Sequence, residues 1–192
     1  MASGFLSVVA WCAYVSAAAT LVTFVTGVLF FTVGQPFGTI QDAASALQVL
    51  LMLPIAWLLH RRIGSSAIVW SWLALIVGVL GMLVAGVLQA LLVVRRVEYE
   101  QTIGAALSAG GAIGVWLVGT GVLALVYSVL PVGLAWAGVA AGAGYLLLVA
   151  GFWLGGQGHP LFWSGSLIAL AGYGVWAIWL GRVALAGGLV AG

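Results

Sequence analysis

The chain has 192 residues, of which 65% are hydrophobic and only 4% are charged, whereas an average soluble domain has about 25% charged residues. A mean hydropathy of +1.31 excludes a soluble globular protein, because such a protein needs far more polar surface to cover its core. A formal net charge of +2 on so few groups excludes a basic surface for nucleic acid. We therefore predict a multi-pass membrane protein that lies in a lipid bilayer and has no nucleic-acid partner.

A helix needs about 20 apolar residues to cross the hydrocarbon core of a bilayer. Polar and Gly/Pro clusters divide the chain into six such runs, and the first is too long for the apolar region of a signal peptide, so we expect it to be retained. The sequence predicts an all-α bundle of about six spans in one transmembrane domain, residues 1–192. The expected spans are residues 7–33, 40–60, 67–94, 103–130, 132–154 and 161–186.

An even number of spans places both chain ends on one face of the membrane. We call this the terminal face and the opposite one the acidic face, because all three acidic residues fall there. The terminal face carries Arg61, Arg62 and Arg182, and the acidic face carries Arg95, Arg96, Asp42, Glu98 and Glu100. The positive-inside rule counts arginine and lysine, so three arginines against two place the terminal face in the cytoplasm. We expect the bacterial plasma (inner) membrane as the location.

Half of the eight charged residues lie within residues 95–100, between the third and fourth spans. Arginines that end one helix and glutamates that precede the next suit the two helix dipoles, so we interpret the stretch as a solvated connection. The alternative is a functional polar patch on the acidic face, in which carboxylates and a histidine bind a divalent cation or relay a proton. Two amides would extend this patch into the membrane. Its candidate residues are Asp42, Gln48, Gln89, Glu98, Glu100 and His159.

Small residues recur at the spacing that lets helices approach closely in a membrane. The pairs are Gly110 and Gly114, Gly138 and Gly142, and Gly151 and Gly155. Two polar stripes run along neighbouring spans, one made of Ser16, Thr20, Thr23 and Gly27 and the other of Gln41, Ser45 and Gln48. We interpret the stripes as interhelical hydrogen bonding, with a substrate groove between spans one, two and three as the alternative.

Two histidines are candidate cofactor ligands. His60 ends the second span on the terminal face and His159 precedes the sixth on the acidic face, so the two cannot hold one metal ion or one haem together. Three tryptophans, Trp116, Trp176 and Trp179, lie deep in their spans and are expected to pack between helices or against a lipid or pigment. The sequence leaves both the cofactor and any bound metal unknown.

A faint internal repeat relates the two halves of the chain. TGVL followed by PFG in residues 26–38 corresponds to TGVL followed by PVG in residues 120–133. An odd number of helices per repeat inverts one half in the membrane, as in many transporters. This pattern predicts a possible inverted three-plus-three arrangement.

Three stretches carry a resemblance: QTIGAAL entering span four, LPVGLAWAGVAAGAGYLLLVAGFW in span five and GVWAIWLGR closing span six. They resemble a broad family of uncharacterised bacterial six-helix membrane proteins that is catalogued as a domain of unknown function. The resemblance implies a six-helix bundle and supplies no catalytic residue. Family members often carry acidic residues inside spans two and six, whereas here span two has only Asp42, near its edge, and span six has none.

The leading functional hypothesis is a non-enzymatic accessory or structural subunit of a larger membrane complex, with other membrane subunits or a second copy as partners. The connections are too short for a catalytic domain, and the chain has no Walker loop and no GxSxG motif. One alternative is a small transporter or channel-like protein with its site between spans one, two and three. Another is a scaffold that binds a cofactor, pigment or lipid. A polar cavity reaching Gln48 would favour transport.

Overall fold

The computed structural model describes residues 3–189, which form six long α-helices, one short 3₁₀ turn and no strand. All six helices are long and apolar enough to cross a membrane. The predicted all-α bundle of six spans is therefore confirmed, and the chain is a multi-pass integral membrane protein. Its elements are α1 (Ser3–Val33), α2 (Phe37–Ile63), α3 (Ile68–Val93), α4 (Tyr99–Val126), α5 (Val132–Gly155), η1 (Gly156–Gly158) and α6 (Pro160–Leu185).

The largest shift from the predicted boundaries occurs in α4, which runs from residue 99 to 126 rather than from 103 to 130. At its start, Glu100 lies in the first helical turn, where a negative charge suits the positive end of the helix dipole. The helix therefore extends into the charged stretch. At its end, Ser128 adopts φ 53°, and the residue before Pro131 is biased away from helical backbone. Residues 127–130 consequently belong to a turn.

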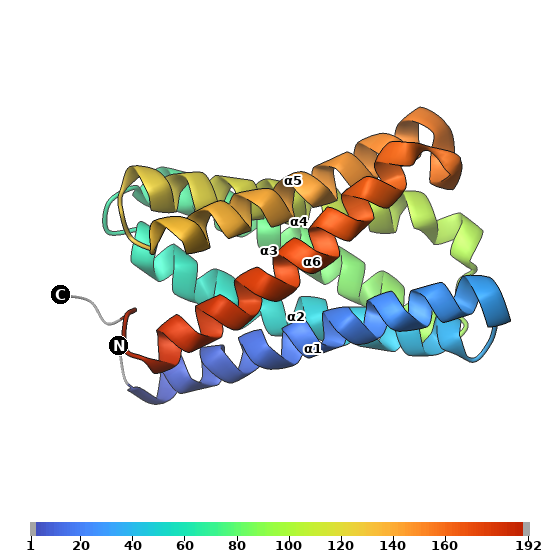
Figure 1. Ribbon diagram of the computed structural model, residues 1–192, viewed down its shortest axis with the longest axis horizontal. Coiled ribbons are helices and arrows are strands. Elements are labelled where there is room, and N and C mark those ends of the chain that lie inside the picture. The colour runs from blue at the N-terminus through green and yellow to red at the C-terminus, as the bar shows by residue number, and fades with distance from the viewer. Residues whose placement is uncertain (1–2, 190–192) are drawn as a thin grey trace.

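The helices form a ring in which each one packs against its neighbours in sequence, and α6 closes the ring by packing against α1. Figure 1 shows that α6 crosses the bundle obliquely, lying near α1 at the terminal face and beside α5 at the other end. The inverted repeat stays a prediction, because a ring of consecutive helices arises with or without one.

Glycines allow the backbones of α5 and α6 to touch along most of their length. A Cβ atom added at Gly144 would collide with the backbone of Ala169, and one added at Gly151 would collide with the backbone of Phe162. Between α4 and α5, a Cβ at Gly114 would lie 2.9 Å from the carbonyl oxygen of Gly142. Close packing through small residues is thus confirmed at these three predicted glycines, Gly114, Gly142 and Gly151.

The tightest part of the core lies in the middle of the bundle and toward the terminal face. Met52, Ile55, Trp116, Tyr173 and Trp176 are all essentially inaccessible. The rings of Trp116 and Trp176 meet at 90° with centroids 6.1 Å apart, a favourable edge-to-face geometry. These two deep tryptophans pack between helices as expected, whereas Trp179 is partly exposed.

Candidate functional site

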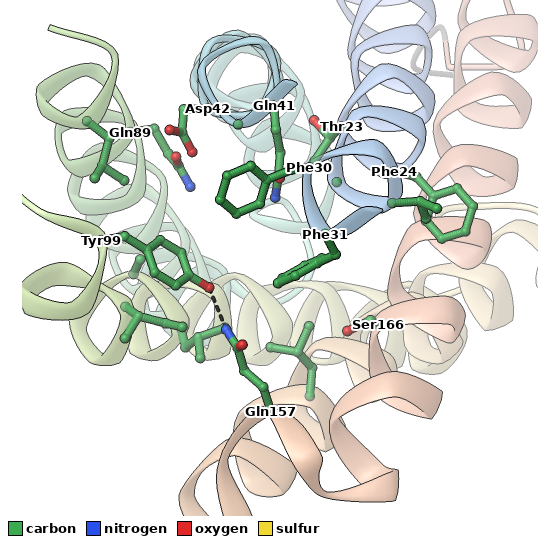
Figure 2. A pocket seen from close by; sticks show the side chains of 18 of the residues that line it. Thr23, Phe24, Phe30, Phe31, Gln41, Asp42, Gln89, Tyr99, Gln157 and Ser166 are labelled. Atoms are coloured by element: carbon green, nitrogen blue, oxygen red, sulfur yellow. Dashed lines mark hydrogen bonds between the residues drawn. The ribbon is translucent and has the colours of Figure 1, made fainter. Parts of the chain in front are cut away.

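A cavity of about 680 Å³ occupies the half of the bundle nearest the acidic face. Small-molecule pockets in proteins have volumes of about 300–1,000 Å³, so this cavity is large enough for a ligand. All six helices contribute to its wall, and Figure 2 shows their side chains arranged around the central space. Its lining is mainly apolar but includes the polar residues Thr23, Gln35, Gln41, Asp42, Gln89, Arg95, Tyr99, Tyr145, Gln157 and Ser166.

The cavity exists because α6 follows α5 rather than α1 as it approaches the acidic face. Near the terminal face, Gly181 of α6 lies against the ring of Tyr14 on α1. Toward the acidic face, Gly165 of α6 instead lies against the backbone of Leu148 on α5. The oblique path of α6 separates it from α1 in this half, as Figure 1 shows. The space between them becomes part of the cavity.

Two aromatic side chains bridge this separation between α1 and α6. The rings of Phe31 and Trp163 are 6.0 Å apart between centroids and meet at 74°. Both line the cavity, and 55% of the Phe31 surface and 47% of the Trp163 surface are exposed. Because the outer surface of a transmembrane bundle faces lipid, this wall separates the cavity from the bilayer by only one layer of side chains.

The inner end of the cavity is polar. Tyr145 of α5 lines the cavity, and its hydroxyl accepts a hydrogen bond of 3.3 Å from Nε2 of Gln48 on α2. Gln48 itself is buried, with 4% of its surface exposed, and lies behind the lining residues. The hydroxyl groups of Thr23 and Ser45 are 3.3 Å apart across the seam between α1 and α2. This bond confirms the predicted hydrogen bonding between the two polar stripes.

Asp42 and Gln89 carry the most unusual polar groups of the lining. Asp42 is half-buried and is the only acidic residue among those that line the cavity within residues 3–189. In this part of the chain, its carboxylate has no hydrogen-bond donor and no ion-pair partner. The amide oxygen Oε1 of Gln89 is buried and also lacks a donor. Figure 2 shows both side chains entering the cavity from the neighbouring helices α2 and α3.

The mouth of the cavity at the acidic face is formed by the connections around α4 and α6. Nε2 of Gln157 in η1 donates a 2.6 Å hydrogen bond to the hydroxyl of Tyr99 at the start of α4, drawn as a dashed line in Figure 2. Arg95 lies on the same rim, is exposed and adopts φ 55° in the turn after α3. Both ends of the cavity are thus polar, whereas the wall between them is mainly apolar, with Asp42 and Gln89 among its few polar residues.

The structure brings together part of the predicted polar patch. Asp42 and Gln89 line the cavity and Gln48 lies behind its inner end, whereas Glu98 and Glu100 are exposed and do not line it. His159 caps α6 instead, because its Nδ1 accepts a hydrogen bond of 3.2 Å from the backbone N–H of Leu161. Across residues 3–189, no three His, Cys, Asp or Glu residues lie close enough to hold a metal ion.

His60, the other candidate cofactor ligand, joins α2 to α3. Its Nδ1 lies 2.8 Å from Oγ of Ser71, and that hydroxyl donates its single hydrogen to the carbonyl oxygen of His60. Nδ1 must therefore carry a proton and act as the donor. The His60 ring also packs against the ring of Trp72, with the two ring centroids 4.3 Å apart. This arrangement gives His60 a structural role between the two helices.

Several residues of the site were not predicted from the sequence, notably Tyr99, Tyr145 and Gln157. Tyr99 and Gln157 lie in stretches that the sequence marked as polar connections, so their position at the acidic face was available as a signal. Tyr145 lies inside an apolar run and gave none. No protein-family model, curated protein or solved structure matches the chain.

Proposed function

We propose that this integral membrane protein is a small transporter that binds an amphipathic small molecule in the cavity between its helices. The observation that carries the proposal is the cavity of about 680 Å³, with mainly apolar walls and a few polar groups. Apolar walls accommodate the hydrophobic body of a ligand, and a few placed polar groups orient it. Tyr145 is one of the polar lining residues, and its hydroxyl is hydrogen-bonded to Gln48.

The packing of the other half supports a cavity that is open toward the acidic face in this conformation. Tyr173, Trp116 and Met52 fill the bundle between the cavity and the terminal face. Passage of a ligand across the membrane therefore requires these helices to move apart, as in transporters that expose one site to each side in turn. Two buried polar contacts, Ser16 with Tyr173 and Gln48 with Tyr145, lie among the helices that would have to move.

The accessory-subunit and scaffold hypotheses remain predictions. The exposed apolar side chains of α3, such as Val69, Leu80 and Val87, offer a broad surface, but contact with lipid requires the same surface. These side chains therefore favour neither a partner subunit nor a monomer. The cavity, in contrast, supports ligand binding over a purely structural role.

The test compares two neighbouring alanines of α4. Ala106 lines the cavity, whereas Ala105 is exposed and does not. The protein would be reconstituted in nanodiscs of zwitterionic lipid and titrated with N-phenyl-1-naphthylamine, an uncharged probe that fluoresces in apolar surroundings. We expect saturable binding to the wild type and to Ala105→Phe, and an affinity at least ~10-fold lower, about 1.4 kcal/mol, for Ala106→Phe. Equal binding to all three proteins would contradict the proposal.

A further inference from the structure

We propose that the ligand is an amphipathic cation that carries N–H bonds, such as a protonated long-chain amine, and that Asp42 and Gln89 hold its ammonium group. This inference rests on the proposed function and names the class of molecule that the cavity takes. Its basis is a pair of acceptors without donors. Within residues 3–189, neither the carboxylate of Asp42 nor the buried Oε1 of Gln89 receives a hydrogen bond.

The position of Asp42 makes an unpaired carboxylate costly. Asp42 is five residues beyond Phe37, the first residue of α2, so it lies about 7.5 Å along the helix at ~1.5 Å per residue. Ionised side chains within a transmembrane segment are normally paired or hydrogen-bonded. An ammonium group supplies up to three N–H donors and no acceptor, so it can donate to the carboxylate of Asp42 and keeps further donors for the amide oxygen of Gln89, which a rotation of that side chain would turn toward the cavity.

The surrounding side chains favour a cation over an anion or a metal ion. Figure 2 shows the rings of Phe30 and Tyr99 in the wall of the cavity that Asp42 also lines, and aromatic faces attract cations. Arg95 is the other charged lining residue, but it lies exposed on the rim, where water solvates it. Calcium takes six to eight oxygen ligands, far more than one carboxylate and one amide provide.

The lining residues also indicate where the apolar part of the ligand lies. Asp42 and Gln89 line the cavity from α2 and α3, whereas Phe31, Trp163 and Leu167 line it from α1 and α6, the two helices that separate in this half. These three side chains are exposed, and they lie at the seam where only side chains separate the cavity from the outside of the bundle. A ligand with its ammonium at Asp42 therefore extends its chain toward the wall that borders lipid.

The experiment measures how strongly matched ten-carbon compounds displace N-phenyl-1-naphthylamine from the full-length protein in zwitterionic nanodiscs at fixed neutral pH. The compounds are decylammonium, decanol and decyl sulfate. For the wild type, we expect decylammonium to compete roughly 10- to 100-fold more strongly than decanol, as for hydrogen bonds to a charged group. Asp42→Asn should lose this preference while still binding decanol and the uncharged probe.

The control is Glu98→Gln, which removes a carboxylate from the same face of the membrane but outside the cavity. Glu98→Gln should keep the preference for decylammonium over decanol, because we assign this preference to Asp42 and not to a general attraction of cations to the acidic face. If Glu98→Gln lost the preference as Asp42→Asn does, the assignment to Asp42 would be overturned. A second measurement needs no variant: decyltrimethylammonium, which has no N–H bond, should compete less strongly than decylammonium with the wild type. Equal competition by these two would overturn the hydrogen-bonded site.

The outcomes separate this inference from the proposed function. Equal displacement by decylammonium and decanol, or stronger displacement by decyl sulfate, would overturn the cationic ligand while probe binding still supported the cavity. A probe that bound Ala106→Phe and Ala105→Phe equally would instead overturn the cavity as a binding site, and the inference with it.

Discussion

The hydroxyl of Tyr173 on α6 lies 2.8 Å from the hydroxyl of Ser16 on α1, and both side chains are fully buried. Ser16 donates its single hydrogen to the carbonyl oxygen of Ala13, 2.9 Å away, so Tyr173 must be the donor of the shared bond. This hydrogen bond joins the first helix to the last near the point where they begin to separate. Its direction determines which partner is more costly to remove.

We predict that Ser16→Ala destabilises the protein more than Tyr173→Phe does. Ser16→Ala leaves a buried O–H without an acceptor, at a cost of about 1–3 kcal/mol, whereas Tyr173→Phe removes one ordinary hydrogen bond, at about 0.5–1.5 kcal/mol. The free energy of unfolding can be measured by titrating the protein in mixed micelles with sodium dodecyl sulfate. Ser108→Ala, at an exposed serine that bonds only within its own helix, is the control and should change little. The reverse order of the two variants would show that Ser16 is the donor.

Alanine substitutions at two glycines, one in α5 and one in α6, should change the free energy of unfolding in opposite directions. At Gly144, an added Cβ would collide with the backbone of Ala169, whereas at Gly174 it would meet nothing within 4 Å. We expect Gly144→Ala to lower the free energy of unfolding by about 1–3 kcal/mol through overpacking. Gly174→Ala should raise it by about 0.4–1 kcal/mol, because alanine favours the helix. The same micelle titration measures both variants. A Gly144→Ala protein with the same free energy of unfolding as the wild type would contradict the close packing of α5 on α6.

The aromatic wall between α1 and α6 should limit how fast a ligand exchanges with the bilayer. Phe31→Ala and Trp163→Ala each remove one ring of the contacting pair. We expect both variants to raise the association and dissociation rates of the probe several-fold, with a smaller change in its affinity. Stopped-flow fluorescence in nanodiscs measures the rates. Trp70→Ala is the control, because Trp70 is exposed on α3 and does not line the cavity; an equal effect there would contradict a wall at Phe31 and Trp163.

His60 should hold its proton on Nδ1, and Ser71 should be needed to keep it in place. Nitrogen-15 chemical shifts of the labelled histidine ring would identify the protonated nitrogen. Ser71→Ala leaves this buried N–H without its acceptor, so we expect a loss of about 1–3 kcal/mol in unfolding free energy. A proton found only on Nε2 would contradict the hydrogen bonds that join His60 to Ser71.

The fold could be predicted from the sequence because lipid imposes simple rules. Each span needs a long apolar run, and backbone groups in the bilayer must bond within their own helix. The ends of the helices could not be predicted where apolar residues continue past a helix. After α4, residues 127–130 continue a mainly apolar run but form a turn before Pro131. The charged residues at its other end still allow a helix from Tyr99.

The cavity could not be predicted, because it depends on the path of α6. That path follows from close contacts of Gly144, Gly151 and Gly165, and in a chain with 29 glycines spacing alone does not show which ones face a neighbouring helix. Asp42 and Gln89 were identified because polar groups are rare in these spans. Their neighbour Tyr145 was missed, because its hydroxyl belongs to an otherwise apolar run.

The closure of the ring by α6 also bears on how the protein is assembled during synthesis. Apart from a small contact between α2 and α4, every pair of helices whose backbones pack closely is consecutive, except α1 and α6. Such local interfaces can form as each new helix enters the bilayer, whereas the interface between α1 and α6 cannot form before α6 is present. The seam that borders the cavity is therefore completed only when the sixth helix has been inserted. Before that moment, the side chains of the future binding site face lipid.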